Sequence, residues 1–218
     1  MTLANGVAGA DYAGGGIFNL MQSVAQACGA PASGHAQCAA LPAERRRLPT
    51  VLLWQSTTGP RQETLALLDE VCNGPSEPMP YDFLATQPAL AAAQIQPFLP
   101  GLQSASHMPL DNGNAANWWL LLTLAGEWLR TGRYAQALCA QLDHQPEMAS
   151  GHWLSLSTAA TPGTLASVAP LATAPGATLA DLPDLPARLN DWLGHAGPAT
   201  CHLESPAAPG LTVEFARL

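Results

Sequence analysis

Apolar residues fall into short blocks along the chain, separated by turns that are rich in Gly and Pro. The block at 116–130 is apolar around most of the helical circumference, which predicts a central helix rather than a superficial one. Gly132 ends that helix, and Arg130 and Arg133 lie where cations favour a helix C-terminus. The next block, 135–142, predicts a buried strand.

The other predicted elements are shorter and are bounded by turn residues. Strands are predicted over 50–55, 151–158, 200–203 and 211–216, and helices over 17–28, 62–72, 88–95 and 185–193. Residues 97–109 are expected to be irregular or partly extended. Residues 159–187, mostly Ala, Pro, Thr and Leu, are expected to be loosely structured with at most one short helix, and no internal repeat is evident.

Composition limits the classes of function. A chain of 218 residues can bury one substantial core, so we expect 159–218 to be a divergent segment that packs on the domain formed by 1–158. Apolar residues make up 48% and charged residues 11%, which favours a protein partner that covers apolar surface. The net charge of -8 argues against a nucleic-acid surface. The chain contains no Lys, which excludes Schiff-base chemistry.

Metal and cofactor sites are not predicted. The five cysteines are scattered without a C-x-x-C pair, which fits reduced thiols in a cytoplasmic protein. A glycine run at 14–16 precedes a predicted helix and could cradle phosphate, but no strand clearly precedes it and the dinucleotide spacing is absent. The loop Asp111–Asn114 lacks the spaced carboxylates that calcium requires. The N-terminus has no signal-peptide pattern, and the longest apolar run is too short to span a membrane.

The order of these elements resembles the N-terminal half of the β-ketoacyl synthases, in the thiolase superfamily. The resemblance covers roughly residues 48–156. Val51-Leu-Leu-Trp-Gln-Ser-Thr-Thr-Gly59 is similar to the family's strand and glycine turn, and Glu127-Trp-Leu-Arg-Thr-Gly-Arg133 with 137–143 is similar to the helix end, turn and strand that follow the nucleophile. The resemblance implies a layered α/β fold, a shortened thiolase-type half-fold.

The resemblance places the nucleophile near Ala115, and no Cys or Ser occurs within 111–119. The family's chemistry needs a thiolate at a helix N-terminus, where the dipole lowers the thiol pKa and backbone N–H groups stabilise an oxyanion. Ala140-Gln141 also replaces a pair of small residues, and His195 and His202 lack the surroundings of the family's catalytic histidines. The chain is therefore similar to non-catalytic, chain-length-factor-like subunits of aryl polyene and other polyketide or fatty-acid-type systems.

Such a subunit would form a heterodimer with an active ketosynthase, meet acyl carrier protein only indirectly, and help shape the acyl tunnel. Candidate tunnel or interface residues are Trp118, Trp119, Phe83, Ala92 and Ile95, the last two within the short helix that the resemblance places at the dimer contact. The tryptophans, and likewise His107, could equally be plain structural residues. Two other functions stay open: a small hydrolase or acyltransferase on an unrelated α/β sheet, although no G-x-S-x-G occurs, and a binding protein that reuses the half-fold.

Overall fold

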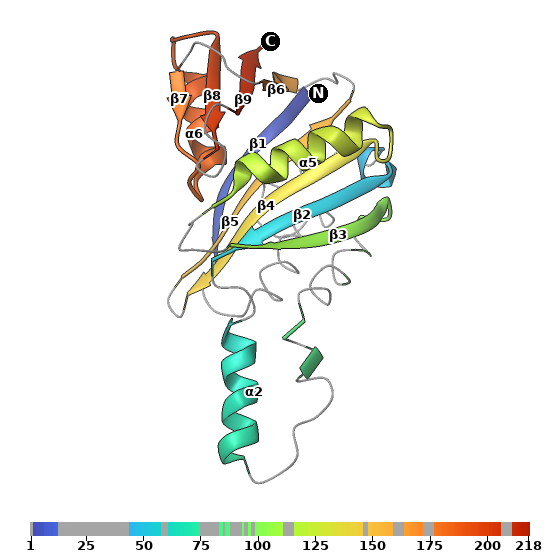
Figure 1. Cartoon of the computed structure of the whole chain (residues 1–218), viewed down its shortest axis with the longest axis vertical. Coiled ribbons are helices and arrows are strands. Elements are labelled where there is room, and N and C mark those ends of the chain that lie inside the picture. The colour runs from blue at the N-terminus through green and yellow to red at the C-terminus, as the bar shows by residue number, and fades with distance from the viewer. Residues whose placement is uncertain are drawn as a thin grey trace.

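A mixed sheet runs through the whole computed structural model and joins strands from both ends of the chain (Figure 1). The structure describes residues 2–12, 44–57, 61–74, 83–84, 86–87, 93, 96, 99–110, 116–145, 148–158, 164–171, 177–205 and 211–218. The strands are β1 Thr2–Tyr12, β2 Thr50–Ser56, β3 Leu102–Pro109, β4 Gln136–Gln145, β5 Met148–Ser157, β6 Thr164–Leu171, β7 Ala177–Leu179, β8 Thr200–Glu204 and β9 Thr212–Arg217. The helices are α2 Arg61–Asn73, α5 Trp118–Arg130 and α6 Leu185–Gly194, with a 3-10 turn at Arg45–Arg47.

The first half of the sheet contains the predicted strands β2, β4 and β5, together with β3 and with β1, which the sequence did not predict. Its order is β3-β2-β4-β5-β1, with β2 parallel to β3 and β4, and β5 antiparallel to β4 and β1. Every residue of β2 is buried, as expected for a parallel strand that is covered on both faces. The expectation of an irregular or partly extended 97–109 is met in its extended part, because 102–109 form the regular outer strand β3.

The second half continues the same sheet in the order β6-β9-β8-β7, and β6 pairs antiparallel with β1. The expectation of a loosely structured 159–187 is therefore wrong, since β6 and β7 lie there. Ala166 and Val168, two positions apart, both point into the core. Because inward side chains of β6 are small, the alternation of apolar and polar residues along it was weak. The Ala- and Pro-rich composition of 159–187 therefore led to the prediction of a loose segment.

The two halves repeat one topology. In each half a helix connects two parallel, paired strands, and the next strand of the chain pairs antiparallel with the second of them. The order is β2-α5-β4-β5 in the first half and β7-α6-β8-β9 in the second. β1 pairs with β5 in the first half, and β6 pairs with β9 in the second. Where the two halves meet, β1 and β6 pair antiparallel with each other, as a pseudo-two-fold axis requires. The sequence showed no repeat because the second half is shorter and its residues have diverged.

Two helices lie in the common core. α5 packs on β4 and β2 and also contacts β9 and β6, whereas α6 packs on β1 and β5 of the other half. The α5 side chains in the core are Trp118, Leu121, Leu122, Ala125 and Leu129. Burial of each large apolar side chain contributes about 1.5–3 kcal/mol. The prediction that 116–130 forms a central helix against 51–55 and 135–142 is confirmed.

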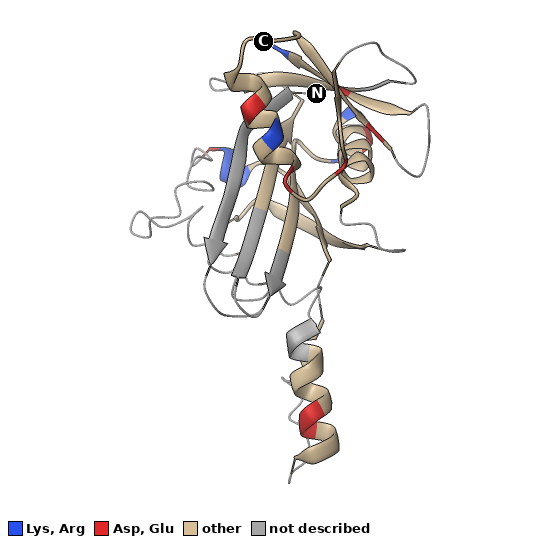
Figure 2. Ribbon diagram, turned by 90° about the vertical axis from the view of Figure 1, so that its left-hand side faces the viewer, with Lys and Arg blue, Asp and Glu red and all other residues tan. Residues whose placement is uncertain are grey.

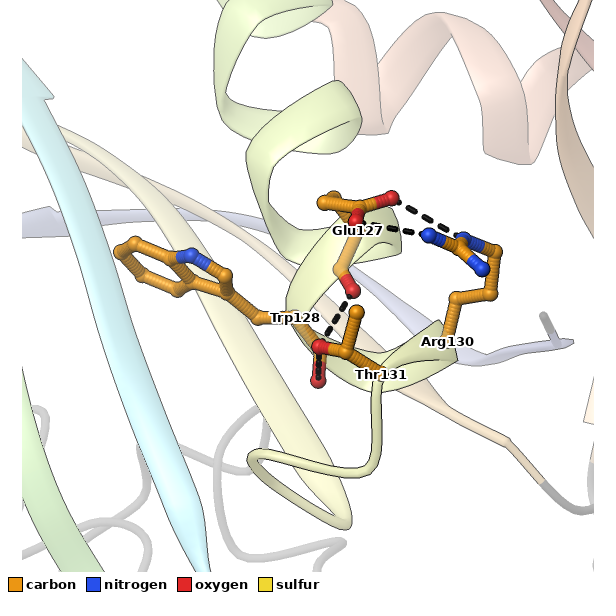
Figure 3. A network of polar contacts seen from close by, with 4 residues as sticks. All are labelled: Glu127, Trp128, Arg130 and Thr131. Carbon is orange, nitrogen blue, oxygen red and sulfur yellow. Dashed lines mark hydrogen bonds and ion pairs between the residues drawn. The ribbon is translucent and has the colours of Figure 1, made fainter.

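α5 ends in a glycine turn that the sequence also predicted. Gly132 has φ 72°, a conformation that favours glycine. The Thr131 hydroxyl lies 2.9 Å from the Glu127 carbonyl oxygen and 3.3 Å from that of Trp128, and it can donate to either (Figure 3). The carboxylate of Glu127 accepts two hydrogen bonds from Arg130, at 3.0 and 2.7 Å, an exposed pair that adds little stability.

α2 projects away from the sheet (Figure 1). It confirms the helix predicted over 62–72, but Leu65, Leu68 and Val71 are all more than half exposed, at 55%, 52% and 56%. The helix predicted over 17–28, the glycine run at 14–16 and most of 88–95 lie outside the described residues, apart from Ala93, which is helical. Among the helices that the structure describes, none combines the length and apolar character needed to cross a membrane.

Candidate functional site at the start of α5

Three segments far apart in the sequence meet at the N-terminus of α5. The backbone N–H of Asn117 donates to Oε1 of Gln55 at 2.8 Å. The N–H groups of Trp118 and Trp119 donate to the two carboxylate oxygens of Asp181, at 2.8 and 3.1 Å. The side chain of Asn117, the N-cap residue, makes no capping hydrogen bond. The first N–H groups of the helix are therefore satisfied by side chains from both halves of the sheet.

The fold explains why Gln55 and Asp181 converge. Gln55 is the penultimate residue of β2, and Asp181 follows two residues after the end of β7. These two strands occupy equivalent positions in the repeated halves. In α/β sheets, loops and helix N-termini gather at the carboxyl ends of parallel strands, which is where such folds usually place their sites.

The electrostatics at Asp181 have two opposing causes. Burial raises the pKa of its carboxyl group above the ordinary value, and the hydrogen bonds from the Trp119 and Trp118 N–H groups lower it. The positive end of the α5 dipole favours an anion at this position. Within the described part of the chain no cationic side chain pairs with Asp181, so the helix N-terminus is its charge partner.

The sequence has no cysteine from 111 to 119, around the start of α5. Ala115, the position that the resemblance gives to the nucleophile, lies outside the described residues. Cys139 is fully buried in β4 and burial raises its thiol pKa far above the usual range. Burial also raises the pKa of Cys201, in β8, to about 12. Burial thus disfavours the thiolate form of both cysteines.

The predicted tunnel and interface residues lie in different environments. Trp118 is 0% exposed in the core, and Trp119 is half-buried against it. Phe83 is 57% exposed. Ala92 and Ile95 lie outside the described residues. The structure thus brings Trp118 and Trp119 to the candidate site and leaves Phe83 on the surface.

The histidines have structural surroundings. The ring of His107 lies 4.2 Å from the ring of Trp54, and burial lowers its pKa. His202 is buried with Nε2 3.0 Å from Oε2 of Glu214, and Nδ1 of the exposed His195 lies 2.7 Å from the Asp191 carbonyl oxygen. Over the described residues, no three His, Cys, Asp or Glu side chains are grouped as metal ligands.

Sequence reasoning missed Gln55 and Asp181 as members of this site. Gln55 had a usable signal, because it is a polar residue at the end of an otherwise apolar strand. Asp181 had none, since it lies in an Ala- and Pro-rich stretch whose partner helix begins 63 residues earlier.

Comparisons with known proteins give the fold its context. No protein-family model and no curated protein matches the sequence. A structure of the ketosynthase ApeO in complex with its chain length factor ApeC, from Xenorhabdus doucetiae, aligns over 100% of both chains with a TM-score of 0.53 and 13% identity. The ishigamide ketosynthase/chain length factor aligns over 78% of this chain and 73% of its own, with a TM-score of 0.55 and 12% identity.

The fold is thiolase-type and ketosynthase-like. The prediction of a layered, thiolase-type α/β fold is confirmed. The sheet is therefore not the unrelated α/β sheet on which the alternative of a small hydrolase or acyltransferase was placed. The repeated halves, with α5 packed against strands of both and α6 packed on β1 and β5, agree with this fold.

Proposed function

We propose that this chain is a non-catalytic, ketosynthase-like subunit that pairs with an active β-ketoacyl synthase, stabilises it and helps to bound its acyl tunnel. In this proposal the chain acts in the cytoplasm within an aryl polyene, polyketide or fatty-acid-type pathway, and meets acyl carrier protein only through its partner. The free thiols of Cys72, Cys139 and Cys201 agree with a reducing compartment.

The start of α5 carries the proposal. A condensing enzyme needs a thiolate at this position and free N–H donors for the oxyanion of its intermediate. Here 111–119 contains no cysteine, and the N–H groups of Asn117, Trp118 and Trp119 are occupied by the chain's own side chains. A ketosynthase-like fold with no cysteine in 111–119 and with occupied N–H donors at the start of α5 supports a non-catalytic role.

The surface supports pairing with another protein. β3 is the outer strand at one end of the sheet, and an uncovered outer strand offers backbone N–H and C=O groups to a partner. Large apolar side chains are exposed on α2 and just after it; these are Leu65, Leu68, Val71, Phe83 and Leu84. Figure 2 shows few charged residues over the strands that it colours. The dimer contact expected around Ala92 and Ile95 remains a prediction.

Co-expression with ketosynthases from the same genome tests the proposal. We expect a stable heterodimer by light scattering, and no condensing activity from this chain alone with acyl and malonyl carrier-protein thioesters. Loading with acyl thioester should acylate the partner's cysteine and none of the five cysteines of this chain, as peptide mass spectrometry would show. Turnover by the isolated chain, or failure to co-purify with any of these ketosynthases, would contradict the proposal.

A further inference from the structure

The contact between Asp181 and α5 has the geometry of a bound anion. Each carboxylate oxygen accepts one N–H, at 2.8 Å from Trp118 and 3.1 Å from Trp119, so consecutive residues of one helix turn clasp a single carboxylate. Helix N-termini bind phosphates and carboxylates in this way because their N–H groups are free and the dipole is positive there. α5 is 13 residues long, so its dipole is well developed.

A second observation shows that this position has more donors than Asp181 uses. Gln55 is 0% exposed, and its Oε1 accepts the Asn117 N–H at the same helix start. Its Nε2, bonded to the same carbon as Oε1, has no hydrogen-bond partner among the described residues. A buried donor without an acceptor is costly, and an anion is the species that such donors favour.

The ligand of this position comes from the other half of the molecule. A local cap would normally come from the N-cap side chain, but that of Asn117 makes no capping bond. Asp181 instead reaches the helix from the turn between β7 and α6, 63 residues beyond Trp118. The N–H groups at the start of α5 thus belong to the first half of the molecule, and the carboxylate that accepts their hydrogen bonds belongs to the second.

We propose that Asp181 is a built-in ligand of an anion site at the N-terminus of α5, and that its carboxylate closes this site to small carboxylates and to an acyl-thioester oxygen. The loss of the nucleophile and the filling of the site are then two separate barriers to catalysis. The inference deepens the non-catalytic role proposed above. It is tested on the isolated chain, so its failure would leave pairing with a ketosynthase untouched.

Chemical rescue provides the first test. Asp181→Ala removes the carboxylate and leaves space for formate or acetate. We expect the thermal midpoint to fall by about 4–8 °C, because two charge-assisted hydrogen bonds are lost. Sodium formate or acetate should restore most of it with an apparent Kd on the order of 10 mM, whereas sodium chloride at equal ionic strength should not.

The matched control is Asp184→Ala, three residues along the same turn. Asp184 is exposed and pairs with Arg188 at 2.9 Å, away from the start of α5. Removal of its carboxylate should give no response to formate or acetate beyond that of chloride, and the wild-type protein should give none either. A response equal in all three proteins, or no saturable response in Asp181→Ala, would overturn the inference.

A second pair of variants covers the case in which Asp181→Ala does not fold. Asn117→Cys places a thiol at the N-cap, next to the N–H groups that Asp181 occupies. In that variant the carboxylate should keep the thiol pKa high, whereas addition of Asp181→Asn should release the site and lower the pKa by roughly one unit. Iodoacetamide labelling of residue 117 at pH 7, followed by peptide mass spectrometry, should become about tenfold faster. Equal labelling rates in the two proteins would also overturn the inference.

Discussion

At the scale of single residues, Asp181 shows how burial and hydrogen bonding act against each other. Burial raises the pKa of its carboxyl group, and the N–H groups of Trp119 and Trp118 limit that rise without cancelling it. The folded chain therefore binds this proton at a higher pH than the unfolded chain does. Where the folded state binds more protons, the free energy of unfolding decreases as pH rises.

We predict that Asp181 gives stability a defined pH dependence. As pH falls from neutral through the folded-state pKa of Asp181 toward its unfolded value near 3.8, the free energy of unfolding should gain a contribution from proton uptake. Asp181→Asn lacks this proton. Urea unfolding of both proteins between neutral pH and pH 4 gives the difference, in which the other titrating groups cancel. The prediction would be contradicted if the difference in unfolding free energy between wild type and Asp181→Asn did not change with pH, or if wild type lost stability relative to Asp181→Asn as pH falls.

Sequence reasoning found one side of the site and missed the other. Trp118, Trp119 and the end of the 50–55 strand were within its reach because continuous apolar runs identify them. Asp181 was not, because its contact with α5 exists only once the second half of the sheet has closed onto the first. A contact across more than 60 residues leaves no local pattern.

At the scale of elements, the predictable ones are those with large apolar side chains in phase. β2, β4 and α5 follow directly from the apolar blocks that predicted them. β6 was missed because its inward positions carry residues as small as Ala166. β3 was missed because an outer strand with half-buried side chains has no continuous apolar run. Large apolar side chains at regular spacing thus determined how well the sequence predicted an element, and α2 was predicted in this way although its apolar side chains are exposed.

The end of α5 allows a prediction at this scale. Gly132→Ala should lower the free energy of unfolding by about 1 kcal/mol, because alanine is strained at φ 72° although nothing lies within 4 Å of the added methyl group. Gly194→Ala, at the end of α6, is the matched control, since its added methyl group also meets open space and its φ is not positive. Chemical denaturation of the two variants measures the difference. Equal stabilities would mean that the α5 turn relaxes without strain.

At the scale of the whole molecule, one hydrophobic core joins the two halves and leaves α2 outside it. The core cluster includes Leu53 and Leu122 from the first half and Leu203 and Phe215 from the second. No described residue of α2 belongs to that cluster, so α2 does not pack into the core. A helix that exposes Leu65, Leu68 and Val71 lowers solubility unless another protein covers these side chains.

The charges on α2 favour one kind of partner over another. Asp69 and Glu70 lie on this helix, and its acidic turn is red in Figure 2. Two copies of the chain that met through α2 would bring these acidic turns together, and the chain already carries a net charge of -8. Like charges that face each other across an interface are unfavourable. A heterologous partner with a basic rim around an apolar groove fits better than a second copy.

We therefore predict that Leu68→Asp weakens association with the partner ketosynthase at least about tenfold, because an unpaired charge would be buried at the contact. The stability of the isolated chain should not change, since Leu68 is already 52% exposed. Ala66→Asp introduces the same charge at an exposed position on another side of α2 and should leave association intact. Titration calorimetry with the purified ketosynthase would measure both variants. Equal affinities would place the contact elsewhere and leave the outer strand β3 as the surface that joins the two proteins.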